Sequence, residues 1–305
     1  MQVFGRPFSH PALAAWSVSN DGPGRFLFGD SAEFETDFSE AYPSSASLKG
    51  PLATLTFGDL ARFGVNFETQ EIVLLEQAPQ STQNDLSHFL FDHVAPRILA
   101  RLGHLVLHGA ALSTDGALIG LLGETGAGKS TLAASLAEQG FTLIGDDSVL
   151  ISESGGRFFG TSIYPSLRLF PESIVAVFSS DVPSSTMAHY SDKRRLDREA
   201  MSQPPAKPLP LAALFYLSDE FDDDGPVASA LTAAQMCMRC TEQSFAMMPA
   251  DPVETQARFG TIARLASAVP GFVLDYERDF ANLPAVHSLI AGAMKTAPAL
   301  APAPS

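Results

Sequence analysis

The pattern of apolar and polar positions divides the chain into parts. From residue 1 to about residue 84, short apolar runs alternate with turn residues, as at 25–28, 53–57 and 71–75. This spacing is typical of a small antiparallel sheet. The apolar positions then follow a helical period, which predicts a helix that kinks at Pro96. The members of this apolar stripe are Leu86, Leu90, His93, Val94, Ile98 and Leu102.

Strand-length apolar runs return after this helix and predict an α/β core. Residues 105–112 and 117–122 are apolar and are joined by a Ser-Thr-Asp-Gly turn, which is a hairpin signal. A helical stretch at 130–139 follows, then a strand at 141–145 and an extended segment at 148–152. Because the first two strands form a hairpin, we expect a mixed sheet rather than a purely parallel one.

Three regions follow from these patterns. A small β-rich region covers 1–84, an α/β domain covers 85–294, and residues 295–305 form a tail rich in Ala and Pro. Such a composition is typical of disorder at a terminus.

Charge and hydropathy exclude several classes of partner. The formal net charge is −15 at pH 7, which argues against a nucleic-acid partner because such proteins usually carry basic patches. No apolar run approaches the roughly 18–20 residues that cross a bilayer, and the first residues lack the pattern of a signal peptide. We therefore expect a cytoplasmic protein without a membrane partner. Nothing in the chain indicates its oligomeric state.

The strongest chemical signal is a complete G-x-x-x-x-G-K-[ST] loop between the strand at 117–122 and the helix at 130–139. Glycines let the backbone turn tightly and bring its N–H groups to phosphate oxygens, and the following helix adds its positive dipole end. Lysine reaches the β- and γ-phosphates, and the serine hydroxyl is the expected Mg²⁺ ligand. The sequence therefore predicts binding of ATP and Mg²⁺. The residues of this site are Gly123, Glu124, Thr125, Gly126, Ala127, Gly128, Lys129, Ser130 and Thr131.

Three blocks around this loop resemble the catalytic domain of HPr kinase/phosphorylase. They are Leu-His-Gly at 107–109, the loop with its extension at 123–133, and a strand at 140–147 that ends in two aspartates. The chain is more similar still to a group of shorter bacterial HPr-kinase-like serine kinases, to which residues 164–170 and 190–195 also correspond. This resemblance spans most residues after about 85. It implies a P-loop kinase domain over 85–294, with the mixed sheet shared by HPr kinase and phosphoenolpyruvate carboxykinase.

The resemblance also implies catalytic roles for three residues. Asp146 would accept the proton of a seryl hydroxyl, Asp147 would help to hold Mg²⁺, and His108 would lie beside Asp146 and tune its charge. The division of roles between the two aspartates stays open. Aspartate pairs after strands also cap turns, and a lone strand histidine is often satisfied within a core.

Four basic residues are further candidates. By resemblance, Arg168 corresponds to an arginine of the HPr kinase signature segment and would contact phosphate or substrate; the alternative is an ordinary surface arginine. Lys193, Arg194 and Arg195 lie in a polar stretch that we expect to be a mobile loop, where they would neutralise transition-state charge or recruit an acidic substrate. The alternative is a solvated charge cluster.

These observations favour an ATP- and Mg²⁺-dependent kinase that phosphorylates a serine of a protein or peptide. The signature glutamate before the arginine is replaced by the run 165–167, Pro-Ser-Leu, so we expect no efficient reverse reaction. Because the leading region also does not resemble the usual N-terminal domain of HPr kinase/phosphorylase, we doubt that HPr is the substrate. Two alternatives stay open: a P-loop ATPase or nucleotide-gated interaction module, and a kinase of a small molecule.

Overall fold

The computed structural model describes residues 8, 11–19, 32–35, 43–178, 182–196, 207–219, 221 and 225–296. The strand expected at 25–28 and the tail beyond residue 296 lie outside these residues. Within the described part of the chain, no helix has both the length and the apolarity needed to cross a bilayer.

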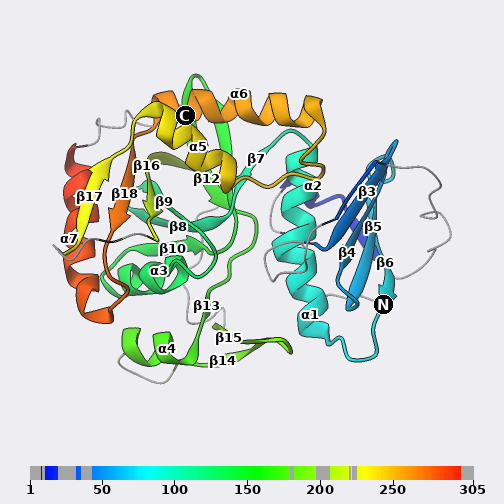
Figure 1. Cartoon of the computed structure of the whole chain (residues 1–305), viewed down its shortest axis with the longest axis horizontal. Coiled ribbons are helices and arrows are strands. Elements are labelled where there is room, and N and C mark those ends of the chain that lie inside the picture. Colours follow the sequence, from blue (N-terminus) through cyan, green and yellow to red (C-terminus); the bar gives the residue numbers. More distant parts are fainter. Residues whose placement is uncertain are drawn as a thin grey trace.

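The leading region forms a six-stranded sheet, seen at the right of Figure 1. Its strands run in the spatial order β1-β6-β5-β4-β3-β2, and all neighbours are antiparallel except β1 and β6. The predicted β-rich region is thus confirmed. Its strands are β1 (Ser17–Ser19), β2 (Ala32–Glu35), β3 (Ser45–Lys49), β4 (Leu52–Phe57), β5 (Ala61–Asn66) and β6 (Glu71–Gln77), with a short helix η1 (Pro11–Leu13) before them.

A continuous helical segment packs against this sheet. It consists of α1 (Gln83–His88), a π-helical turn η3 (Phe89–Val94) and α2 (Ala95–Arg101). The ring of Phe89 stacks on Phe57 of the sheet with centroids 4.4 Å apart. The helix expected from the apolar stripe is present, and it shares one hydrophobic cluster with the leading sheet. The domain boundary at 84/85 stays a prediction.

The second sheet has nine strands and is mixed, as expected. Strands β8 and β9 form the antiparallel hairpin, whereas β9 and β18 both run parallel to β16. The apolar run at 105–112 is divided at His108 into two strands, β7 and β8, which have different neighbours. The strands are β7 (Leu105–Leu107), β8 (Gly109–Thr114), β9 (Ala117–Leu122), β10 (Thr142–Gly145), β11 (Val149–Ser154), β12 (Arg157–Ser162), β16 (Leu209–Leu217), β17 (Val227–Ala230) and β18 (Gly271–Asp275).

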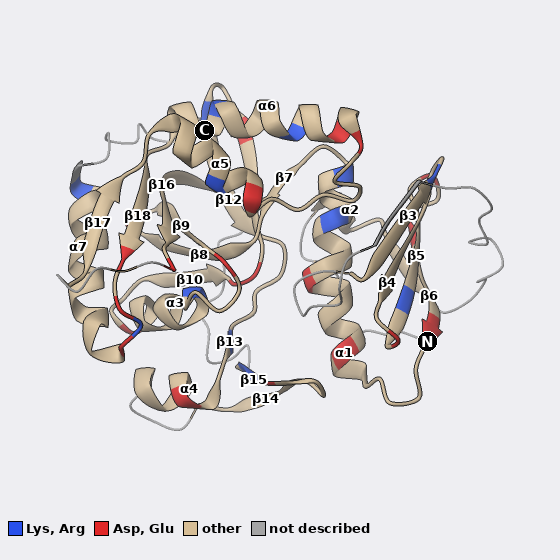
Figure 2. Ribbon diagram, in the orientation of Figure 1, with Lys and Arg blue, Asp and Glu red and all other residues tan. Residues whose placement is uncertain are grey.

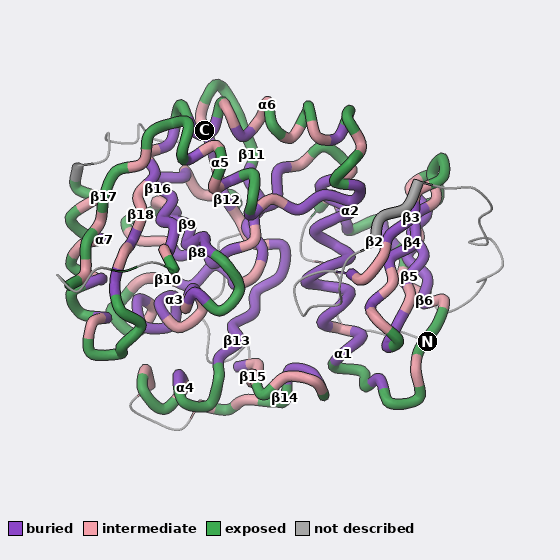
Figure 3. The backbone as a smooth tube through the Cα atoms, viewed as in Figure 1, coloured by how far each residue is buried: buried purple, intermediate pink, exposed green. Residues whose placement is uncertain are grey.

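Helices cover both faces of this sheet because its central strands are apolar on both sides. Along β9, Ile119 and Leu121 enter the cluster with α3 and α7, whereas Leu118 and Leu122 enter the cluster with α5 and α6. The central strands are buried and these helices expose their outer sides (Figure 3). The helices are α3 (Lys129–Glu138), α5 (Ala233–Glu242), α6 (Pro252–Ala268) and α7 (Leu283–Thr296).

A small third sheet lies below the α3 end of the large sheet in Figure 1. Its strand order is β13-β15-β14, and both neighbouring pairs are antiparallel. The prediction of a mobile loop around Lys193 is therefore wrong, because the three basic residues belong to the hydrogen-bonded strand β15. Charged residues of both signs are distributed over all parts of the molecule (Figure 2). The remaining elements are β13 (Arg168–Leu169), α4 (Pro171–Val177), β14 (Ser184–Ala188), β15 (Ser191–Leu196) and η5 (Phe280–Asn282).

Candidate active site

Sheet topology brings the carboxyl ends of four strands to one edge. Strands β9, β16 and β18 are parallel neighbours, and β10 runs in the same direction because it is antiparallel to β8. In such sheets ligands bind beyond the carboxyl ends of the strands. The segments that leave this edge carry the glycine-rich loop after β9, the two aspartates after β10 and residues 276–279 after β18.

The glycine-rich loop has the backbone of a phosphate cradle. Gly123, Gly126 and Gly128 all have positive φ angles, of 144°, 88° and 87°. A Cβ on Gly123 would lie 2.9 Å from the carbonyl oxygen of Leu217, so only glycine fits there. Gly128 caps α3 without a side-chain hydrogen bond, which leaves the first-turn N–H groups to an anion. This geometry fits the phosphates of a nucleoside triphosphate.

Lys129 lies within this cradle. Its Nζ donates to the carbonyl oxygens of Gly123 at 2.7 Å and Glu124 at 2.8 Å. Burial lowers the pKa of Lys129, against the opposing effect of Asp147 and Asp146. The lysine is therefore held between the loop and both carboxylates, as its predicted phosphate contact requires.

Asp146 and Asp147 follow β10 but have different surroundings. The Asp146 side chain is 1% exposed and contacts the Ser130 hydroxyl, and burial together with the neighbouring Asp147 raises its pKa to about 7. Asp147 has a positive φ of 66° and a side chain that is 24% exposed. Burial acts to raise the pKa of Asp147, but the Arg168 guanidinium, 3.1 Å away, holds it below the usual value. The two carboxylates thus have pKa values shifted in opposite directions.

His108 lies at the break between β7 and β8. Its backbone N–H donates to the carbonyl of Gln243 at 2.6 Å, outside either ladder. Burial and the nearby Lys129 lower the pKa of its ring to about 4, so the ring is neutral near pH 7. Its carboxylate neighbour is Asp147, which also accepts a hydrogen bond through its backbone carbonyl. The structure therefore places His108 in the site, in contact with the second aspartate.

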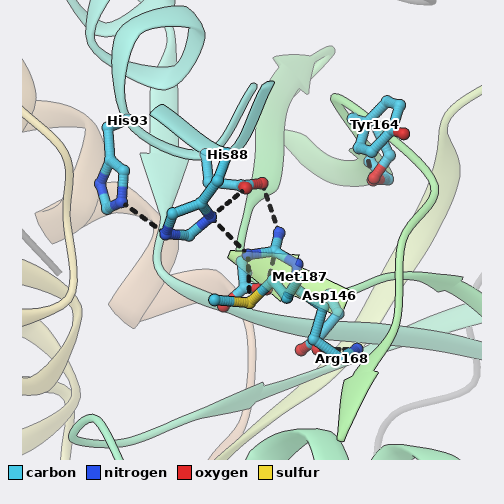
Figure 4. A network of polar contacts seen from close by, with 9 residues as sticks. His88, His93, Asp146, Tyr164, Arg168 and Met187 are labelled. Carbon is cyan, nitrogen blue, oxygen red and sulfur yellow. Dashed lines mark hydrogen bonds and ion pairs between the residues drawn. The ribbon is translucent and has the colours of Figure 1, made fainter. Parts of the chain in front are cut away.

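Arg168 is 3% exposed, so the alternative of a surface arginine is wrong. One terminal nitrogen, Nη2, lies 2.5 Å from Asp92 and 3.1 Å from Asp147. The other, Nη1, lies 2.9 Å from Nδ1 of His88 (Figure 4). The guanidinium is thus enclosed by side chains of the protein, and its predicted contact with phosphate or substrate stays a prediction.

The three basic residues of β15 alternate in direction, as strand residues do. Lys193 lines the cavity and places its Nζ 5.3 Å from the centre of the Phe170 ring. Arg195, on the same side, acts electrostatically on Asp92. Arg194 points away and donates to the hydroxyl and carbonyl of Ser184 at 2.9 and 2.8 Å. Only Lys193 of the three reaches the candidate site directly.

A cavity of about 270 Å³ is lined by the glycine-rich loop and by His108, Lys129, Ser130, Asp147, Arg168 and Lys193. Asp146 is not among its lining residues. Its lining also contains two groups of residues that the sequence did not connect with the site. The first group is His88, Asp92, His93 and Met187, and the second is Tyr276, Arg278, Asp279, Phe280 and Leu283. One signal was available for the first group: polar residues interrupt the helical stripe, and His93 itself occupies an apolar position in it. Nothing in the sequence connected the second group with the loop.

The donor set suits Mg²⁺ in the company of phosphates. No cluster of three His, Cys, Asp or Glu side chains arranged for a metal occurs in the described part of the chain. Mg²⁺ does not need one, since it commonly takes one or two carboxylates together with substrate phosphates and waters. The Ser130 hydroxyl and the aspartate pair could supply the hard oxygen ligands of such a site.

Comparison with known proteins gives similarity over a limited part of the chain. No protein-family model matches. The HPr kinase/phosphorylase of Mycoplasmopsis pulmonis (strain UAB CTIP) is 41% identical over 58 residues, which is 19% of this chain and 19% of the relative. That of Clostridium botulinum (strain Eklund 17B / Type B) is 39% identical over 74 residues, 24% of this chain and 22% of the relative. The matched segments thus span about a fifth of the length of these relatives.

A solved structure, the Hpr(Ser) kinase/phosphatase from Coxiella burnetii, aligns with a TM-score of 0.33 at 12% identity over 62% of this chain and 89% of that one. The sequence matches confirm the HPr-kinase-like resemblance that the three motif blocks indicated.

Proposed function

We propose that this protein is an ATP- and Mg²⁺-dependent kinase that transfers the γ-phosphoryl group to a serine hydroxyl of a protein or peptide. The observation that carries the proposal is that Lys129, Ser130 and Asp147 line one cavity, while the buried Asp146 interacts with Ser130. Phosphoryl transfer needs these parts: a cradle for the phosphates, oxygen ligands for the metal, and a carboxylate near the nucleophile. The similarity to proteins named HPr kinase/phosphorylase supports a kinase-like activity.

The nucleotide is bound by the loop and by the wall that follows β18. Backbone N–H groups of the loop and the Lys129 ammonium hold the phosphates. Arg278 lies beside the loop, with its Cδ 3.5 Å from the position of a Cβ on Gly128, and its guanidinium donates to the carbonyls of Tyr276 and Ser218. No carboxylate pairs with it among the described residues, so its charge is directed at a phosphate. Phe280, 41% exposed at the cavity, offers a ring face to the nucleoside.

Ser130 and one carboxylate of the pair hold Mg²⁺. When bound, the metal neutralises charge on the phosphates during transfer. The protein contributes the fixed positions of these oxygens. Asp146, for instance, accepts from the backbone N–H of Arg168 at 3.4 Å while it contacts Ser130.

The second carboxylate accepts the proton of the serine hydroxyl. The sequence-based assignment gives this role to Asp146, and a pKa of about 7 is near the value at which a general base works best. The contacts favour the exchanged assignment, because Asp146 touches Ser130 whereas Asp147 lines the cavity. Assays with excess Mg²⁺ or Mn²⁺ distinguish the two assignments of base and metal ligand. The excess metal should partly rescue the Asn variant of the metal carboxylate and leave the Asn variant of the base inactive.

The acceptor binds beside Lys193, which lines the cavity next to Phe170. Among the described residues no carboxylate lies within salt-bridge distance of Lys193. Its ammonium can stabilise charge on the transferred group or bind an acidic residue beside the acceptor serine. The run 165–167, which lacks the signature glutamate, is the basis for proposing that the reverse reaction is inefficient. The leading region, which does not resemble the usual N-terminal domain of HPr kinase/phosphorylase, is the basis for doubting that HPr is the acceptor.

Intact-mass spectrometry after incubation with Mg-ATP tests the proposed activity. Candidate acceptor peptides and the protein itself should gain the mass of one phosphate, and Asp146→Asn should abolish the gain while ATP still binds. Release of free phosphate without any modified acceptor would instead indicate an ATPase. Tight nucleotide binding without turnover would indicate a nucleotide-gated module.

A further inference from the structure

A wide helical turn outside the predicted catalytic motifs supplies the wall of the site that faces Arg168. In η3 the backbone hydrogen bonds join residues five positions apart instead of four, as in a π-helix. Side chains four and five positions apart therefore lie on the same side of the helix. His88, Asp92 and His93 are such residues. Nδ1 of His88 lies 2.7 Å from Asp92, and the two Nε2 atoms of the histidines are 3.4 Å apart.

These side chains continue into the catalytic groups through one guanidinium. Nη2 of Arg168 lies 2.5 Å from Oδ1 of Asp92 and 3.1 Å from Oδ2 of Asp147, so a single nitrogen bridges the two carboxylates. Figure 4 shows the sequence of contacts from the histidines through Arg168 to the strand segment that carries Asp146. The two residues of the central ion pair are buried: Arg168 is 3% exposed and Asp92 is 5% exposed.

The bridge is well suited to fixing a position and poorly suited to binding a ligand. Asp92 and His88 surround the guanidinium on one side and Asp147 on the other, and breaking one contact would leave a buried charge without its partner. The segment that carries Asp92 is itself anchored, because Phe89, Leu90 and Val94 pack into the core of the leading sheet. Asp147 is thereby connected to a rigid part of the molecule outside the nucleotide-binding core.

We propose that Asp92 is a positioning residue for phosphoryl transfer: through Arg168 it holds Asp147 in its productive place, so that the helical segment packed on the leading sheet completes the active site. This inference rests on the proposed kinase function. It assigns to the π-helical turn a part in catalysis that acts through Arg168.

Kinetic analysis of Asp92→Asn provides the test. The nearly isosteric amide keeps the packing and removes the charge that holds Arg168. We expect kcat to fall by about 100-fold, the loss typical of a small misplacement in an active site, with KM for ATP unchanged. Arg168→Lys should give the same split, because an ammonium cannot reproduce the guanidinium fork, and the double variant should be no slower than either single one.

A matched control lies on the same helical segment. Asp85 is also a buried carboxylate and contacts His189 at 2.6 Å, but it lies outside the cavity. Asp85→Asn should lower thermal stability and leave kcat unchanged. An unchanged kcat in Asp92→Asn, an effect confined to KM for ATP, or an equal kcat loss in Asp85→Asn would each overturn the inference.

The Arg168 side-chain NMR signals give a readout that does not depend on kinase activity. In the wild type we expect slowly exchanging guanidinium protons, and their shift and exchange rate should change in Asp92→Asn and stay constant in Asp85→Asn. If no acceptor is phosphorylated, the kinase function fails, while phosphate release to water and these signals still decide the role of Asp92. Arg168 signals identical in wild type and Asp92→Asn would refute the positioning role alone.

Discussion

The two sides of the cavity are built in different ways. The nucleotide side consists mainly of one continuous run, 123–131, to which Arg278 and Phe280 are added, and most of the chemistry of this run belongs to the backbone. The carboxylate side unites Asp92, His108, Asp147 and Arg168 from four separate elements and depends on buried side-chain charge. The first side is fixed by local conformation and the second by tertiary packing. We therefore expect substitutions on the nucleotide side to weaken ATP binding and those on the carboxylate side to slow phosphoryl transfer.

The largest effect should come from the carboxylate side. Asp146→Asn and Asp147→Asn should each lower phosphoryl transfer by roughly 100- to 10,000-fold, the usual contribution of a positioned base. ATP affinity should stay within a few-fold of wild type, because the loop is intact. Single-turnover assays together with equilibrium binding of a non-hydrolysable ATP analogue measure both quantities. Undiminished transfer in either variant would contradict its assigned role.

Lys129→Ala should affect both sides. The ammonium contacts the loop carbonyls and is electrostatically coupled to both aspartates, so its removal weakens the cradle and changes the charge near the base. Loss of a charge-assisted contact costs about 1.5–3 kcal/mol, or roughly 10- to 150-fold in ATP affinity. Titration calorimetry with the same ATP analogue measures this loss of affinity. A variant that binds ATP normally but transfers slowly would place the lysine on the carboxylate side instead.

Arg278→Met should weaken the nucleotide side alone. If the guanidinium contacts a phosphate, affinity for ATP should fall by about 3- to 10-fold and affinity for adenosine should not change. Arg264→Met is the matched control, since Arg264 is an exposed arginine that pairs with Glu153 far from the loop. Equal losses for ATP and adenosine would place Arg278 at the nucleoside.

The smallest expected effect is on stability. The folded-state pKa of Asp146, about 7, is above the value of about 3.8 in the unfolded chain, so the folded protein binds the extra proton and loses stability as pH rises from 4 to 7. Without nucleotide and Mg²⁺, Asp146→Asn should therefore melt roughly 2 °C higher than wild type at pH 8, as about 1 kcal/mol would give. The two should converge near pH 4. Scanning calorimetry at pH 8 and at pH 4 measures the sign of the difference in melting temperature between Asp146→Asn and wild type.

The sequence predicted the nucleotide side far better than the carboxylate side, for a physical reason. Gly123, Gly128 and Lys129 act through local conformation, which adjacent residues encode. Asp146 and Asp147 were found because they end a strand at a known spacing. Asp92 and Arg278 depend on which elements become neighbours, and no local pattern contains that information.

The error at Lys193 has a similar origin. Three adjacent basic residues suggested a solvated loop, whereas strand alternation sends Lys193 into the cavity and Arg194 to Ser184. The pairing register of β15 with β13 and β14 decides this direction. The helix at 83–101 was expected from its period, but its π-helical turn was not, because the period of an apolar stripe does not show one widened turn.

The packing of the π-helical turn on the leading sheet has a consequence for synthesis on the ribosome. Chains fold from the N-terminus as they emerge, at roughly 5–20 residues per second. The sheet and the helical segment with Asp92 can therefore be assembled before Arg168 leaves the ribosome. The buried arginine would then emerge into a chain that already presents its counter-ion Asp92, so the order of translation would provide a partner for this buried charge as soon as it appears.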